Sequence, residues 1–124
     1  MRKLVIPMLL FVTVLTGCGV RSAAEPSSPE AVGLDHLSFT PASKTITTGT
    51  RLEFSNSGSR ALHVLVLGED AQPRTQAGAP SFGGASGHRS EVGDRWLTPS
   101  WNTPGNYRVT CTLHPSMNLT VTVR

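Results

Sequence analysis

Three residues near the C-terminal end of the sequence carry side chains that bind soft metal ions. Cys111, His114 and Met117 follow one another at intervals of three residues. Thiolate, imidazole and thioether groups together favour copper, and Cu(I) in particular, over hard cations such as magnesium or calcium. This spacing lets one tight loop bring all three side chains to a single ion. The site then requires a fourth ligand from elsewhere in the chain.

The N-terminal residues bear on the first of these ligands, because they hold the second cysteine. Residues 1–17 read as a signal peptide, with the basic start Met1-Arg2-Lys3 and an apolar run over 4–15 that is shorter than the about 20 residues needed to span a bilayer. The run ends in Leu15-Thr16-Gly17-Cys18, which resembles the bacterial lipobox. That resemblance implies that Cys18 is lipidated and anchors the mature chain to a membrane. The alternative is a plain signal peptide with an incidental cysteine.

Acylation of Cys18 would leave Cys111 without a disulfide partner, since the chain has two cysteines. A lone thiol in an extracytoplasmic, oxidising compartment calls for an explanation, and metal ligation provides one. The mature chain would have 124 − 17 = 107 residues, with 11 − 2 = 9 basic side chains against 8 acidic ones. This near balance gives no support to nucleic-acid binding.

The remaining sequence predicts short strands and no amphipathic helix. Residues 18–33 are small, polar and proline-containing, which predicts a flexible tether, and residues 34–124 form the single domain. Alternating apolar and polar residues, β-branched content and flanking turn residues predict an all-β sandwich. The expected strands cover 34–39, 45–48, 51–55, 61–67, part of 91–101, 107–111 and 119–123. The Gly- and Pro-rich segment 68–93 is expected to be a surface loop with one short strand.

The strand 61–67 offers the missing fourth ligand, His63. A single histidine in a strand is more often structural than a ligand, but the C-terminal motif requires a partner. Two imidazoles, one thiolate and a weak, distant thioether form the arrangement of blue-copper electron-transfer centres.

The domain also resembles the cupredoxin family, and its ligand loop is similar to that of amicyanin. The resemblance rests on Pro104-Gly105-x-Tyr107-x-x-x-Cys111-x-x-His114-Pro115-x-Met117, and on Gly49-Thr50-x-Leu52-x-Phe54-x-Asn56 before His63. It implies a Greek-key β-sandwich with one mononuclear type 1 copper site, in which His63, Cys111 and His114 are equatorial ligands and Met117 is axial. The sequence departs from the family at Val64, where many members have an asparagine that ties the two ligand loops together.

Several other residues have simpler interpretations. His36 and His88 are expected to lie outside the ligand set, the first as a surface side chain and the second in the 68–93 loop. Asn56 is expected to fix a turn. Trp96, Trp101 and Tyr107 are expected to be core aromatics.

Three functions follow from these residues. The first is a membrane-anchored blue copper protein that carries single electrons, is not an enzyme, is monomeric, and meets redox proteins at an apolar surface around His114. The second is a copper-binding lipoprotein for copper storage, delivery or resistance. The third is a β-sandwich scaffold without metal. The first two place the domain outside the cytoplasm.

Overall fold

The computed structural model describes residue 19 and residues 27–124. The predicted signal peptide, Cys18 and residues 20–26 lie outside the described residues, so the division into signal peptide, tether and domain stays a prediction. Within the described part of the chain, no helix is both long enough and apolar enough to cross a membrane.

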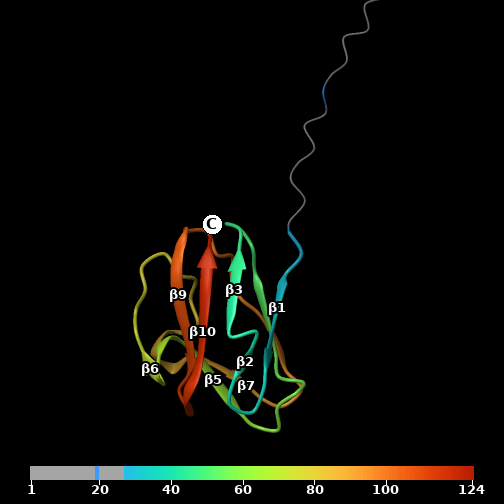
Figure 1. Ribbon diagram of the computed structural model, residues 1–124, viewed down its shortest axis with the longest axis vertical. Coiled ribbons are helices and arrows are strands. Elements are labelled where there is room, and N and C mark those ends of the chain that lie inside the picture. The colour runs from blue at the N-terminus through green and yellow to red at the C-terminus, as the bar shows by residue number, and fades with distance from the viewer. Residues whose placement is uncertain (1–18, 20–26) are drawn as a thin grey trace, which may run out of the picture.

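The described residues form two sheets that face each other in a sandwich (Figure 1). One sheet has the strand order β2-β1-β4-β8. The other has the order β3-β10-β9-β5-β6, with β7 also paired to β5. The elements are β1 (Glu30–Leu34), β2 (Phe39–Thr40), β3 (Ser43–Ile46), β4 (Leu52–Ser55), β5 (His63–Glu69), β6 (Gln72–Pro73), the 3-10 helix η1 (Gly84–Ser86), β7 (His88–Ser90), β8 (Arg95–Leu97), β9 (Gly105–Cys111) and β10 (His114–Val123). The predicted all-β sandwich is confirmed.

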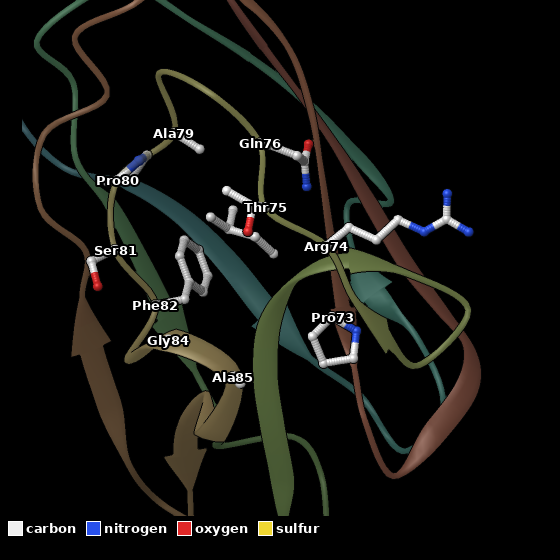
Figure 2. Close-up of a pocket in the computed structure, with 11 residues that line it drawn as sticks. Pro73, Arg74, Thr75, Gln76, Ala79, Pro80, Ser81, Phe82, Gly84 and Ala85 are labelled. Carbon is white, nitrogen blue, oxygen red and sulfur yellow. The ribbon is translucent and has the colours of Figure 1, made fainter.

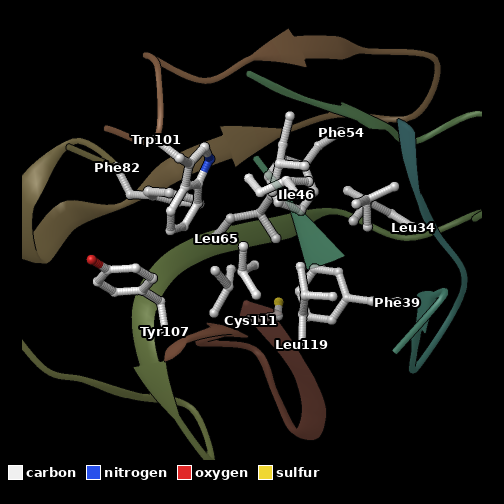
Figure 3. Close-up of a cluster of buried hydrophobic side chains, with 14 of the residues drawn as sticks. Leu34, Phe39, Ile46, Phe54, Leu65, Phe82, Trp101, Tyr107, Cys111 and Leu119 are labelled. Carbon is white, nitrogen blue, oxygen red and sulfur yellow. The ribbon is translucent and has the colours of Figure 1, made fainter. Parts of the chain in front are cut away.

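Alternating side chains explain how the two sheets pack. In β10, Leu119, Val121 and Val123 are buried, while Thr120 and Thr122 between them are half-buried. This is the period-two pattern of a strand with one face on a core. The opposing sheet contributes its own buried side chains, among them Phe39 and Phe54 (Figure 3). The core includes Val32, Leu34, Phe39, Leu52, Phe54, Leu65, Phe82, Trp101, Tyr107, Val109 and Cys111.

The first strand lies earlier in the chain than the sequence predicts. The expected strand at 34–39 is wrong: β1 begins at Glu30 and ends at Leu34, and residues 35–38 form a turn closed by a 2.9 Å hydrogen bond from the Asp35 N–H to the Ser38 carbonyl. Part of the expected tether is therefore in the sheet. The cause is parallel pairing with β4, which buries Val32 and Leu34. The local composition of small and polar residues does not reveal this pairing.

The 68–93 segment is more ordered than a surface loop. It contains β6, η1 and β7, and it also inserts Phe82 into the core between the two sheets. The Phe82 ring lies 4.9 Å from Trp96 and 6.0 Å from Trp101, measured between ring centroids, in both cases edge to face. Such contacts, together with the buried area, hold the segment against the sandwich.

The two ends of the sandwich differ in what they hold. Residues Ser27 and Ser28 line a small cavity with Arg124, so the chain enters the domain beside its C-terminal residue. The parallel strands β3 and β10 also end here, with Val123 opposite Ile46. The first residue of β10, His114, nine residues before Val123, lies at the other end (Figure 1).

Candidate metal centre

Three adjacent strands bring the predicted ligands together at the end of the sandwich opposite Ser28 and Arg124. His63 is the first residue of β5, Cys111 is the last of β9, and His114 is the first of β10. Strand β9 lies between the other two, and Cys111 is paired with both Leu65 and His114. The two residues between Cys111 and His114 form a tight turn. Directly opposed positions in a hairpin place their side chains close together.

The ligand atoms of His63, Cys111 and His114 all lie within 4.8 Å of one another. Cys111 Sγ and His114 Nδ1 are 3.4 Å apart, and the two imidazole centroids are 5.0 Å apart. His63 and Cys111 are fully buried, and His114 is half-buried. No disulfide occupies the Cys111 sulfur within the described residues. The three side chains therefore converge on one small volume.

The orientation of the His63 ring is fixed by a serine that the sequence does not single out. Ser59 Oγ lies 2.9 Å from His63 Nε2, and both residues are buried. The second ring nitrogen, Nδ1, is buried and has no hydrogen-bond partner among the described residues. An unpartnered buried nitrogen is costly in a folded protein. A metal ligand bond would satisfy it, and the bond to Ser59 is the type of outer contact that orients metal-binding histidines.

The two ligand loops are joined through the backbone at Val64. The Val64 N–H donates to Cys111 Sγ at 3.4 Å, and the Thr112 N–H donates to the Val64 carbonyl at 2.9 Å. Backbone groups are available whichever side chain is present. The absence of an asparagine after His63 therefore does not leave the loops unconnected.

The surroundings of His63 keep its imidazole neutral. Burial lowers the pKa of His63 below its usual value, and repulsion from His114 and then His36 lowers it further, while the backbone of Asp35 opposes the shift. Metal ions bind the neutral imidazole. The pKa shift of His63 thus favours the form that can be a ligand.

Met117 lies in an irregular part of β10. The register of β10 against β9 shifts between His114 and Asn118, and Met117 itself is fully buried. Its carbonyl accepts a 2.9 Å hydrogen bond from Thr110 Oγ1, which fixes the backbone at this position. The thioether is held in the core three residues after His114. Its place as the axial ligand is a prediction.

The other two histidines, His36 and His88, lie outside the proposed ligand set, but His36 is close to His114. His88 lies in β7 and not in a loop, and its ring stacks on Trp96 with a centroid distance of 3.9 Å. His36 is exposed, as expected, but its ring centroid is 6.1 Å from that of His114. The sequence gives no sign of this proximity, since the two residues are far apart in the chain.

Asn56 fixes the loop before His63, as the sequence indicates. Its Nδ2 group donates to the carbonyls of Ala61 and Ser90 at 3.0 Å each. These bonds connect the residues that precede His63 to β7. The loop therefore has a defined path into the metal centre.

Comparisons with known proteins agree with this architecture. Neither the models of known protein families nor the curated proteins give a match to the sequence. Among solved structures, amicyanin from Paracoccus versutus superposes with a TM-score of 0.59 at 19% identity, covering 82% of this chain and 86% of that one. A purple cupredoxin from Nitrosopumilus maritimus gives a TM-score of 0.60 at 17% identity, covering 77% and 99%. The chain has a cupredoxin fold.

This fold also occurs within a larger protein. The Cu-containing nitrite reductase from Thermus scotoductus matches with a TM-score of 0.62 at 22% identity, over 85% of this chain but only 24% of that one. At such identities the likeness concerns the fold alone. These comparisons therefore show the cupredoxin fold of this chain and not its role.

Those residues fit a single type 1 copper site. The donor set is one thiol, two imidazoles and a buried thioether, which is the set that selects copper. The unpartnered His63 Nδ1 and the N–H donated to Cys111 Sγ give the site the features of a metal centre. Neither feature is expected in a purely apolar core, where a buried nitrogen without a partner is destabilising.

Proposed function

We propose that this chain is a membrane-anchored mononuclear blue copper protein that carries single electrons between redox partners. The observation that supports it most directly is the buried convergence of His63, Cys111 and His114 on three adjacent strands of a cupredoxin fold. Copper, when bound, supplies a one-electron change between Cu(I) and Cu(II).

In this proposed function, the protein chain holds the metal ligands in fixed positions. His63 and Cys111 are fixed by strand pairing and by bonds from Ser59 and the Val64 N–H, and Met117 would be the axial ligand. Strand ends in a packed sandwich move little. The ligands therefore keep one arrangement in both oxidation states, so that little reorganisation accompanies electron transfer.

His114 is the proposed point of contact with redox partners. It is half-buried, whereas the other members of the set are fully buried. Leu113, which precedes it, is 50% exposed, and Leu37, which follows His36, is 52% exposed. Exposed large apolar side chains beside a functional group favour a transient docking surface.

A carrier fits these features better than an enzyme does. A cleft of about 420 Å³ lies against the 68–93 segment and is lined by residues such as Pro73, Pro80 and Phe82 (Figure 2). None of the proposed metal ligands lines it. This cleft is therefore separate from the metal centre, where the partly exposed His114 supports electron transfer.

Cys18 is the proposed attachment point to the membrane, after removal of residues 1–17. We propose that the domain is extracytoplasmic and monomeric. Incorporation of a labelled fatty acid into the full chain in a bacterial host, and its loss in Cys18→Ser, is the expected result. Labelling that persists in Cys18→Ser would contradict the anchor without affecting the copper centre.

Spectroscopy tests the copper function. Addition of Cu(II) to the chain produced without its first 18 residues is expected to give an intense visible thiolate-to-copper charge-transfer band, and Cys111→Ser is expected to abolish it. Reversible voltammetry of the loaded protein would support electron transfer. A complete absence of the band in the native sequence would refute the blue-copper centre.

A copper-handling role is the second candidate. The observation that favours it is the exposed imidazole of His36 beside His114, which a pure electron carrier does not need. A strong band combined with irreversible voltammetry would favour storage or delivery of copper over electron transfer.

A further inference from the structure

The metal centre is exposed to solvent on the side of His114. His63, Cys111 and Met117 have no exposed surface, and His114 is the only proposed ligand that is partly exposed. The partly exposed His114 ring is therefore the part of the cluster that an ion from solvent can contact first. The side chains next to this ring on its outer side therefore decide how the ion arrives.

One of these neighbours is itself a metal-binding group. His36 lies in the exposed turn between β1 and β2, and its ring centroid is 6.1 Å from that of His114. The turn is fixed by the 2.9 Å hydrogen bond from Asp35 to Ser38 and by the bond from Thr40 Oγ1 to the Asp35 carboxylate. Burial, then repulsion from His114 and from His36, lowers the pKa of His63, which agrees with the position of His36 near the metal centre.

His114 thus lies between two imidazoles of different exposure. Its centroid is 5.0 Å from that of buried His63 and 6.1 Å from that of exposed His36. Imidazole nitrogen binds transition metals at about 2 Å, so two rings that share one ion have centroids roughly 6 Å apart or less. Both distances are compatible with a shared ion.

The two nitrogens of His114 are available on different sides of its ring. Nδ1 faces Cys111 Sγ at 3.4 Å and belongs to the inner cluster. Nε2 is on the other side of the imidazole. One ring can therefore serve the inner centre with Nδ1 and, together with His36, an ion outside it with Nε2.

We propose that His36 and His114 form an outer copper-binding point through which the ion is loaded into the buried centre. This proposal rests on the proposed copper function. Cu(II) would first be held by two imidazoles and would then exchange them for Cys111, His63 and His114 Nδ1, with the thiol proton of Cys111 released to solvent. Copper keeps its oxidation state in this exchange, so no electron donor or acceptor is required.

Loading kinetics test this directly. Apoprotein is mixed with one equivalent of Cu(II), and the thiolate-to-copper band is followed by stopped flow for the native sequence, His36→Ala and Leu37→Ala. Loss of one of two imidazoles is expected to slow the appearance of the band roughly tenfold in His36→Ala. The final band intensity should equal that of the native protein, because His36 is not an inner ligand. Leu37→Ala, at the next residue and also exposed, should load at the native rate, because its side chain offers no metal ligand.

A second measurement isolates the outer point. In the Cys111→Ser background, Cu(II) binding is measured by calorimetry with and without His36→Ala, and roughly tenfold weaker binding without His36 is expected. Equal loading rates in His36→Ala and Leu37→Ala would overturn the proposal. If the native protein shows no band at all, the proposed function fails, and the calorimetric pair then decides the outer point alone: weaker binding without His36 supports it, and unchanged binding refutes it.

Discussion

Ser59 is the residue on which the orientation of the buried imidazole depends. Its hydroxyl lies 2.9 Å from His63 Nε2, and this contact leaves Nδ1 as the free nitrogen of the ring. Outer contacts of this kind change metal affinity by about 10–100-fold. We expect Ser59→Ala to fold and to bind copper more weakly by a factor in this range, as measured by competition with a chelator of known affinity.

The matched control for this prediction is Ser57→Ala. Ser57 lies in the same loop, is exposed, and its hydroxyl contacts Ser55 at 3.1 Å and not a proposed ligand. Copper affinity in Ser57→Ala should equal that of the native protein. Equal affinities in the two variants would mean that strand packing alone orients His63.

At this scale, the sequence predicts which residues cluster but not what orients them. Cys111, His114 and Met117 stand out because few side chains bind soft metals, and His63 follows because the motif is incomplete without a fourth ligand. The contact from Ser59 has no comparable signal, since serine in a turn-rich stretch is ordinary. The role of the Val64 backbone is also invisible, because every residue has an N–H group.

The β5–β6 hairpin contains a local strain that a single substitution should relieve. Asp70 and Ala71 form its two-residue turn and have φ angles of 51° and 63°. Positive φ is unfavourable for alanine and neutral for glycine. We expect Ala71→Gly to stabilise the protein by about 0.5–1 kcal/mol, measured by urea unfolding of the metal-free protein.

Ala42→Gly provides the comparison for this substitution. Ala42 is exposed and lies outside the strands, and its φ is not positive. Added backbone freedom without relief of strain should leave the stability unchanged or lower it slightly. A lower unfolding midpoint in Ala71→Gly than in the native protein would contradict the interpretation of the turn as strained.

Elements with regular alternation are predictable, and those stabilised by distant partners are not. The core of β10 and the short β4 follow from apolar residues at every second position. The sequence does not predict strand β1, because its place in the sheet depends on parallel pairing with β4. The insertion of Phe82 into the core was missed for a similar reason, since one aromatic residue in a glycine-rich stretch has no periodic pattern.

The fold as a whole should lose stability as the pH falls. The pKa of His63 is lowered, first by burial and then by repulsion from His114 and His36, and that of His88 is lowered by burial. The unfolded chain binds protons at a pKa of about 6.5, where the folded protein does not. Stability is therefore retained above this pH and falls below it, by at most about 1.4 kcal/mol per pH unit for each group.

Urea unfolding of the metal-free protein at pH 7.5 and pH 5.5 measures this loss. His63→Gln should lose less stability between the two pH values than the native protein does. His36→Gln, at an exposed position, should reduce this loss by a smaller amount. An equal loss of stability in the native protein and His63→Gln would show that burial of this imidazole does not control the pH dependence.

The position of the metal centre at one end of the sandwich determines which surface can exchange electrons. The metal centre lies at one end, whereas Ser28 and Arg124 lie at the other. Two copper-loaded copies that exchange an electron have to approach through the end with His114 and Leu113. Since Leu113 is 50% exposed there, Leu113→Glu would place like charges opposite each other in such an encounter, which is unfavourable.

We expect electron self-exchange in Leu113→Glu, measured by NMR line broadening in mixtures of the two oxidation states, to slow at least about tenfold, equivalent to about 1.4 kcal/mol. Ser28→Glu adds the same charge at the opposite end and should leave the rate unchanged. Equal slowing in both variants would mean that net charge, and not the surface around His114, controls the encounter.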